Sequence, residues 1–284
     1  MTTRTIEQIE TASVEWVGPN KVLRALPTRN LKQVDPFLFI DHLQPQTLVP
    51  GGQAMRIAPH PHAGFEVVTY LLDGAFFHRD SKGHEQVAHA GDLNWMTAGS
   101  GVIHSEGPTA AYVESGGPLQ LMQVWINLPA AEKFRPASFV HYQSSQLPVW
   151  NGPDGWVKVL IGSFQGLHSP VSTHTSMFYY HIRIAAGQRI TLPVPPDHTA
   201  ALYVMAGKIR ILQQIASSGQ LVNSSMNGDQ LIFTGEEDSE LIAFGGLPIG
   251  EKVVSYGPFV MNSMAEIQQV MADYESGKMG TLAY

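Results

Sequence analysis

The sequence of 284 residues contains no cysteine. Disulfide bonds, thiolate zinc sites and cysteine-ligated iron–sulfur clusters are therefore excluded. Charge is also scarce: charged residues make up 14% of the chain, and the formal net charge is −7 without a cluster of basic residues. Because proteins that bind nucleic acid through its phosphates carry such clusters, we expect no direct contact with nucleic acid.

Long apolar runs are missing as well. Residues 1–15 have no apolar core, so we expect no signal peptide, and no later run is long enough to span a membrane. These absences predict a soluble, cytoplasmic protein without a membrane partner.

Turn-forming residues are plentiful, with 27 glycines and 19 prolines, and hydrophobic residues make up 44% of the chain. Short β-branched and aromatic runs alternate with turn signals such as Asp73-Gly74 and Gly91-Asp92. This spacing is typical of an all-β barrel or sandwich. The clearest helix signal comes near the end, where the capping box Ser263–Glu266 precedes an apolar stripe that stops at Gly277. We expect this helix to pack on a barrel.

Two pairs of residues with metal-binding side chains stand out. His60 and His62 are two positions apart, and so are His104 and Glu106. In an extended strand, residues i and i+2 point to the same face, so each pair can aim both side chains at one point. Prolines at positions 59 and 61 exclude a helical geometry for the first pair. Two such strands in a small barrel predict a metal site of three imidazoles and one carboxylate.

Nitrogen and oxygen donors without sulfur favour iron, manganese, nickel, copper or zinc. Four protein ligands on a six-coordinate ion leave two positions for exchangeable ligands, which suits oxygen chemistry better than a closed structural site. Glu66 has the same even parity as His60 and His62, so we expect it to face the same cavity. It is a candidate for a fifth ligand, an outer-shell partner or a general base, and a carboxylate bound to loop amides is an equal alternative.

Other polar residues carry weaker signals. His78, His84 and His89 flank or follow a hairpin turn, and we expect them to be solvated. Gln123 and Trp125 share one face of a strand predicted over residues 119–128, so they are candidates for lining a pocket, although core packing explains Trp125 equally well.

The second half of the chain repeats the first. Tyr70–Gly74 is similar to Tyr203–Gly207, and Gly91-Asp92 matches Gly228-Asp229 at nearly the same spacing. We therefore expect a metal-binding domain over residues 1–140 and a degenerate copy with the terminal helix over residues 141–284. The repeat places four residues that cannot bind metal through their side chains at the ligand positions of the second copy: Pro193, Pro195, Leu241 and Ala243.

The runs around both ligand pairs, His60–Gly74 and Gly91–Glu106, resemble the signature of the pirins, a family of the cupin superfamily. Asp35–His42 and Tyr256–Asn262 resemble the family too, so the likeness covers almost the whole chain. The resemblance implies two tandem cupin barrels (the double-stranded β-helix, or jelly roll) with iron in the N-terminal one. The implied ligands are His60, His62, His104 and Glu106. The wider cupin pattern would place a ligand at Glu66, and we follow the family.

Pirins of this kind are reported to oxidise the flavonol quercetin with dioxygen. The first hypothesis is therefore a non-haem Fe(II) dioxygenase that acts on a flavonol-like substrate, with Glu106 or Glu66 as the base; zinc, nickel, copper and manganese are alternative occupants. Other pirins are metal-dependent regulators, so the second hypothesis is a redox-dependent binding protein that recognises a transcription factor or a metabolic enzyme. A third is a bicupin that holds a metal without turnover. Fold alone does not decide among them.

Overall fold

The computed structural model describes residues 1–18, 20–54 and 56–283. The chain forms two compact units, which we call the first and the second barrel. The first barrel comprises Val14–Leu23, Phe39–Ser144 and Ile249–Tyr284, and the second comprises Met1–Ser13, Arg24–Leu38 and Ser145–Pro248.

This division differs from the expected boundary between residues 140 and 141, because each end of the chain joins the barrel that is distant in sequence. The N-terminal strand β1 (Ile6–Thr11) pairs antiparallel with β22 (Gln220–Ser224) of the second barrel. Near the other end, Phe259 forms a β-bridge with Ala63 of the first barrel. Long-range backbone pairing of this kind leaves no local pattern in the sequence.

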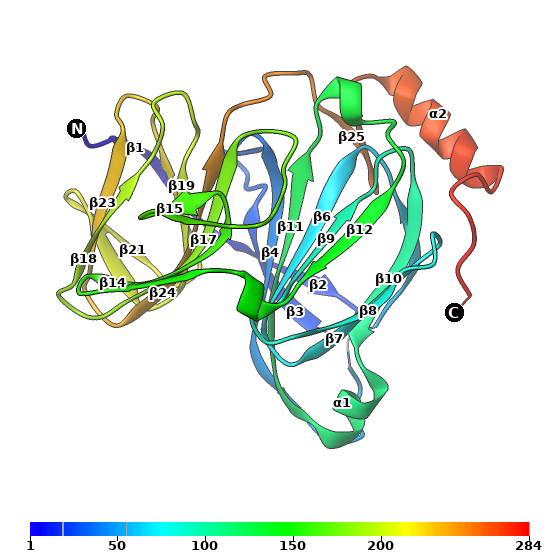
Figure 1. Cartoon of the computed structure of the whole chain (residues 1–284), viewed down its shortest axis with the longest axis horizontal. Helices are drawn as coiled ribbons and strands as arrows, with labels where there is room; N and C mark the ends of the chain where they lie inside the picture. Colours follow the sequence, from blue (N-terminus) through cyan, green and yellow to red (C-terminus); the bar gives the residue numbers. More distant parts are fainter. Residues whose placement is uncertain (19, 55, 284) are drawn as a thin grey trace. The chain divides into compact units, whose positions relative to one another are not determined.

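The first barrel is built from two antiparallel sheets (Figure 1). The larger has the order β12 (Ser138–Tyr142), β9 (Leu93–Thr97), β6 (Phe65–Asp73), β11 (Gly117–Asn127), β4 (Phe37–Leu48), β3 (Asn20–Leu26) and β2 (Ser13–Val17). The smaller has the order β5 (Ile57–His62), β10 (Val102–Pro108), β7 (Ala75–Asp80) and β8 (Glu85–His89). Residues along β7 alternate between half-buried and buried positions, as expected for a strand with one face toward a core.

The second barrel repeats this architecture. Its larger sheet has the order β1, β22, β19 (Ala201–Ala206), β24 (Ser239–Gly246), β17 (Met177–Ile184), β14 (Gly155–Ile161) and β13 (Val149–Gly152). Its smaller sheet has the order β18 (Arg189–Pro193), β23 (Gln230–Gly235), β20 (Lys208–Ile211) and β21 (Gln214–Ser217). The short strands β15 (Ser163–Phe164) and β16 (Leu167–His168) form a separate pair.

Matching the two strand orders corrects the repeat alignment. The order β5-β10-β7-β8 corresponds to β18-β23-β20-β21, so the counterpart of β10 is β23. Leu241 and Ala243, expected opposite His104 and Glu106, lie instead in β24, the counterpart of β11. The buried, register-paired residues of β18 and β23 are Ile190 with Phe233 and Leu192 with Leu231. In the second barrel these apolar side chains fill the interior at the strands that carry the histidines in the first.

Helices are few and short. α1 (Ala110–Ser115) begins after the N-cap Thr109, and α2 (Met264–Glu275) begins after Ser263, whose hydroxyl accepts from the backbone N–H of Glu266. The predicted capping box is thus present. Ile267 and Val270 are the buried residues of α2, which packs on the hairpin β25 (Val254–Tyr256) and β26 (Phe259–Met261) (Figure 1). The 3₁₀ turns Ala130–Glu132 and Ser144–Gln146 follow β11 and β12.

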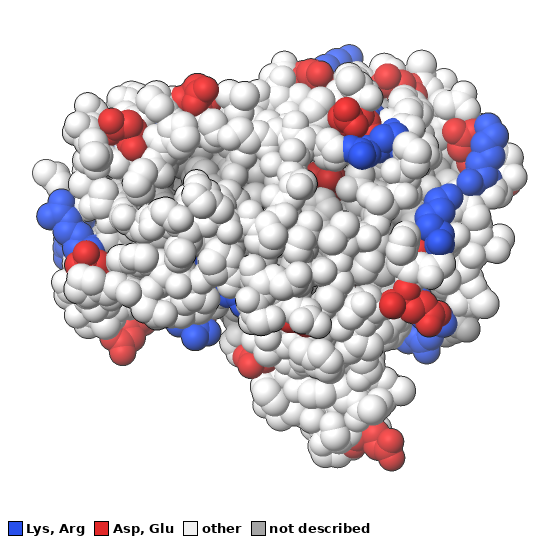
Figure 2. Space-filling model, in the orientation of Figure 1, with Lys and Arg blue, Asp and Glu red and all other residues white. Residues whose placement is uncertain are grey.

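The prediction of an all-β fold with two barrels and a C-terminal helix is confirmed. Within the described part of the chain, no helix is both long and apolar enough to cross a membrane. On the face shown in Figure 2, acidic and basic side chains stand in small groups between wide areas of uncharged surface.

Candidate metal centre

Three imidazoles converge inside the first barrel. His60 and His104 are direct register partners on β5 and β10, and His62 lies two positions along β5. The ring centroids are 4.3 Å apart for His60 and His104, 4.7 Å for His60 and His62, and 5.0 Å for His62 and His104. Their ring nitrogens include one atom from each residue such that all three atoms lie within 4.8 Å of one another.

The hydrogen bonds of these rings leave nitrogen atoms available to a metal ion. His60 Nδ1 lies 2.8 Å from the Ala58 carbonyl oxygen, and His62 Nδ1 lies 3.2 Å from that of Pro258. When Nδ1 donates to a carbonyl, the lone pair of a neutral imidazole is on Nε2. His104 is 1% exposed, and both of its ring nitrogens are buried without a hydrogen-bond partner among the described residues. A bound cation would satisfy such a group, so the residues fit a metal site.

Burial keeps these imidazoles neutral, which is the form that binds metal. Desolvation lowers the pKa of His60, against a smaller opposing effect of the Ala58 carbonyl. Desolvation and the neighbouring His60 lower the pKa of His62 to about 3. The pKa of His104 is well below its ordinary value, first because of burial and then because of the surrounding imidazoles.

Glu106 lies in the same barrel but outside the three-histidine cluster. Its carboxylate accepts a hydrogen bond from Gln123 Nε2 at 2.9 Å, and the Thr69 hydroxyl lies 3.5 Å away. The Thr69 hydroxyl makes its shorter hydrogen bond, 2.7 Å, to Gln123 Oε1. Burial raises the pKa of Glu106 to about 7, although both of these contacts lower it. A carboxyl group with this pKa can exchange a proton near neutral pH.

Two residues near the histidine cluster, His78 and Asp80, were not predicted from the sequence to lie there. His78 and Asp80 on β7 are the register partners of Glu106 and His104, so their side chains share the face of β10 that carries these two residues. His78 is 3% exposed, its ring lies 5.5 Å from that of His104, and it stacks on Phe139 at 4.1 Å. The expectation that His78 is solvated is wrong. The i, i+2 spacing that identified the other pairs also joins His78 to Asp80 on β7, and is the signal that could have found it.

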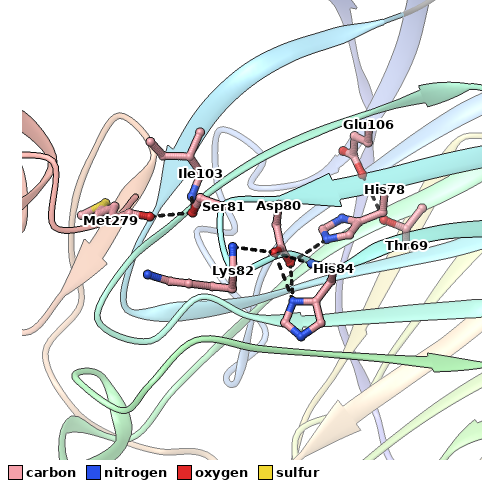
Figure 3. Close-up of polar contacts among 9 residues, drawn as sticks. All are labelled: Thr69, His78, Asp80, Ser81, Lys82, His84, Ile103, Glu106 and Met279. Carbon is pink, nitrogen blue, oxygen red and sulfur yellow. Dashed lines mark hydrogen bonds and ion pairs between the residues drawn. The ribbon is translucent and has the colours of Figure 1, made fainter. Parts of the chain in front are cut away.

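Asp80 organises the turn that follows β7 (Figure 3). Its carboxylate lies 3.1 Å from His78 Nε2 and 2.9 Å from His84 Nδ1, and it accepts from the backbone N–H groups of Lys82 and His84. Burial raises the pKa of Asp80, but these hydrogen bonds outweigh burial and lower the pKa to about 2. The charged carboxylate therefore fixes the orientation of the His78 ring beside His104.

Glu66 lies on the other side of the large sheet. Its Oε1 accepts hydrogen bonds of 2.9 Å from both Trp95 Nε1 and the Thr97 hydroxyl. Because successive residues of a strand alternate in facing, Glu66 on β6 points away from the face that Thr69 presents to Glu106. This is contrary to the expectation from parity, since the break at Gly64 (φ +86°) between β5 and β6 interrupts the alternation. Burial raises the pKa of Glu66 to about 7, so a raised pKa alone does not identify the base.

Aromatic side chains of the first barrel lie next to His62. Trp125 and Gln123 share one face of β11, as predicted, and the Trp125 ring lies 5.2 Å from His62 and 4.5 Å from Phe65. Phe39 stacks on Trp125 at 4.6 Å. Phe65 is fully buried, whereas Trp125 is partly exposed, so Trp125 is the flat apolar surface beside His62 that suits a planar aromatic ligand.

A cavity of about 870 Å³ borders the small sheet, and Phe77, His78 and Arg79 of β7 are among its lining residues. The three clustered histidines do not line it. His78, whose ring lies 5.5 Å from that of His104, stands between the cavity and the cluster.

Comparison with known proteins agrees with this architecture. The chain matches the Pirin family model over residues 19–126 and the model of the Pirin C-terminal cupin domain over residues 179–280. A Pseudomonas aeruginosa protein named as a proposed quercetin 2,3-dioxygenase is 32% identical over 271 residues, covering 94% of this chain and 95% of the relative. Human pirin is 32% identical over 282 residues, covering 97% and 93%. The crystal structure of quercetin 2,3-dioxygenase from Acinetobacter baumannii superposes with a TM-score of 0.94 at 28% identity, covering 99% of this chain and 100% of that one.

Two barrels of this topology, with a histidine cluster in the first, define a bicupin. Both family models and the full-length relatives place the chain more narrowly: it belongs to the pirin family.

Proposed function

We propose that the protein is a non-haem Fe(II) dioxygenase that oxidises a flavonol such as quercetin. The observation that carries the proposal is the convergence of His60, His62 and His104, with Glu106 two positions after His104 on β10. Glu106 supplies a carboxyl group with a pKa of about 7. The activity in the names of the Pseudomonas and Acinetobacter relatives supports the choice of substrate.

The predicted ligands have distinct parts in this proposal. The three imidazoles hold the ion, and their carbonyl partners at Ala58 and Pro258 fix the rings of His60 and His62. Glu106 is the proposed fourth ligand, and its carboxylate accepts from Gln123 Nε2 at 2.9 Å. When bound there, Fe(II) supplies redox chemistry toward dioxygen and lowers the pKa of a coordinated hydroxyl group.

Glu106 is the proposed proton acceptor for the substrate hydroxyl. Its ionised carboxylate takes the proton at one oxygen, while Gln123 Nε2 donates to Oε1 and holds the group in place. Thr69 in turn donates to Gln123 Oε1, which fixes the orientation of the amide. Glu66 has no part in this step because its carboxylate lies on the other face of β6.

The aromatic side chains beside His62 orient the substrate. Trp125 is partly exposed and its ring lies 5.2 Å from that of His62, so a flat bicyclic substrate can stack on it while its hydroxyl group faces the histidines. Phe65 is fully buried and packs against Trp125 at 4.5 Å, which fixes the Trp125 ring. Stacking also excludes water from the reacting atoms.

The test is oxygen uptake by protein loaded anaerobically with Fe(II), at measured metal content, on a panel of flavonols. We expect consumption of dioxygen that depends on quercetin and is lost in His62→Ala. Consumption no faster than that of free iron in buffer, at full occupancy, would refute the dioxygenase. The regulatory alternative would then lead, and capture of a transcription factor or metabolic enzyme by oxidised versus reduced protein would test it.

A further inference from the structure

Lys133 is a buried cation that the proposed reaction does not use. It is 1% exposed, and its ammonium group donates to three oxygen atoms: the Gly64 carbonyl at 2.8 Å, Asn127 Oδ1 at 2.7 Å and the Val260 carbonyl at 3.1 Å. Burying a lysine is costly unless all its donors are satisfied, and here three donors have three acceptors. These acceptors come from segments that are far apart in sequence, so the ammonium joins them at one point.

One of these segments carries the outer partner of His62. The strand β26 lies along residues 62–64: Val260 N–H donates to the Ala63 carbonyl at 3.0 Å, and the Pro258 carbonyl faces His62 Nδ1 at 3.2 Å. Gly64 has φ +86°, and a side chain there would lie 2.0 Å from the Val260 carbonyl oxygen. The backbones of β26 and Gly64 therefore approach as closely as glycine allows, and Lys133 bridges them.

The turn that carries Lys133 also holds the approach to the second ligand strand. Ser100 N–H donates to the Arg135 carbonyl at 2.8 Å, and Gly64 N–H donates to the Gly99 carbonyl at 2.8 Å. Residues 99–101 lead directly into β10 and His104. The turn at residues 133–135 is thus bonded to both ligand-bearing segments.

Residues of the C-terminal segment are hydrogen-bonded to the residues just before this turn. Glu251 accepts from Ala130 N–H at 2.7 Å and from Asn262 Nδ2 at 3.0 Å. Burial lowers the pKa of Lys133 to about 8, and the charges of Glu251 and Glu266 oppose that effect. Lys133 is therefore mostly charged at neutral pH and donates all its hydrogen bonds.

We propose that Lys133 is a positioning residue of the metal centre: by joining Gly64 to Val260 it holds the Pro258 carbonyl against His62 and sets the spacing between the two ligand strands. The inference rests on the metal centre of the proposed function. Groups that orient a metal ligand typically change metal affinity by about 10–100-fold when they are removed. Lys133 contacts neither metal nor substrate, so its effect passes through His62 and the backbone.

The experiment measures Co(II) affinity of metal-free protein, followed by the ligand-field absorption of the bound ion. We expect Lys133→Met to bind Co(II) about 10–100-fold more weakly than the unmodified protein and to show altered absorption bands. Lys158→Met is the matched control, because Lys158 is also buried, at 4% exposure, but lies on β14 of the second barrel. Chemical unfolding of each metal-free variant gives its stability separately. We expect both variants to lose stability and only Lys133→Met to lose affinity.

Two results would overturn the inference: unchanged affinity in folded Lys133→Met, or an equal loss in Lys158→Met. If Lys133→Met does not fold, the Asn127 variants decide. Asn127→Leu removes one acceptor and should weaken binding, whereas Asn127→Asp retains that acceptor and should restore it; equal affinity in these two variants would contradict the positioning role. If His62→Ala itself binds Co(II) normally, the assignment of His62 as a metal ligand is wrong, and the proposed function fails with it.

Discussion

Replacing Glu106 with glutamine removes one proton acceptor from the first barrel while keeping the size of the side chain. The amide oxygen of the new residue can still accept from Gln123 Nε2, which lies 2.9 Å from the carboxylate in the native protein. The fold and the histidine cluster should therefore survive. What is lost is a group whose pKa is about 7, so that roughly half of it is ionised at pH 7.

Loss of a general base typically costs about 10²–10⁴-fold in rate. We expect Glu106→Gln to lose turnover of quercetin by this factor, which corresponds to about 3–5 kcal/mol in the activation barrier. The assay is oxygen uptake under saturating dioxygen, normalised to iron measured in the same sample. Normalisation matters because a loss of metal would otherwise be counted as a loss of catalysis.

Glu66→Gln is the matched control. Glu66 is also buried and its pKa is also about 7, but its carboxylate accepts from Trp95 and Thr97 on the other face of β6. We expect near-normal turnover per iron in this variant. Normal turnover in Glu106→Gln would refute the assignment of the base. A large loss of turnover in Glu66→Gln at full iron content would show that the Glu66 carboxylate takes part in the reaction, contrary to its placement on the other face of β6.

The remaining predictions concern metal binding, stability in acid and the carboxylate of Asp80. His62→Ala should reduce bound iron sharply while the protein stays folded, as checked by metal analysis and circular dichroism, because His62 supplies one of three clustered ligands. For the metal-free protein, the pKa of His62 falls from 6.5 to about 3 on folding, so the unfolded chain binds more protons between these values. Stability should therefore decrease as the pH falls from about 6.5 toward 3, by up to about 4–5 kcal/mol, and urea unfolding of the native protein should show a steeper decline than that of His62→Ala. Asp80→Asn should destabilise the first barrel by about 2 kcal/mol, because hydrogen bonds from His78 and His84 lose their charged acceptor; unchanged thermal and urea unfolding would contradict this.

Local periodicity predicted the residues that lie together along one strand. His60 with His62 and His104 with Glu106 were identified because strand geometry repeats every two residues. The turn signals predicted a barrel or sandwich, and the internal repeat predicted that it occurs twice. The same rule failed across Gly64, where the chain reverses its facing and sends Glu66 to the other side of the sheet. His78 was expected to be solvated because it flanks a hairpin turn, but it occupies one of the buried positions that alternate along β7.

Other parts of the site depend on contacts between distant segments, which no local pattern encodes. Pro258 and His62 are separated by 196 positions, and Lys133 reaches Val260 across 127. The internal repeat was recognised, yet two short anchors could not fix its alignment, so Leu241 and Ala243 were placed one strand away from the true counterparts of His104 and Glu106.

The pairing of β26 with residues 62–64 has a consequence for the order in which the protein is made. During translation, which adds about 5–20 residues per second, the 196 residues between His62 and Pro258 take roughly 10–40 s to synthesise. Throughout that interval the histidines exist without the carbonyl that orients His62. We therefore expect a nascent or truncated chain that ends before Pro258 to hold the His62 ring less firmly than the full chain does. On this expectation, the ligand orientation of the proposed metal centre is completed only when β26 has been synthesised.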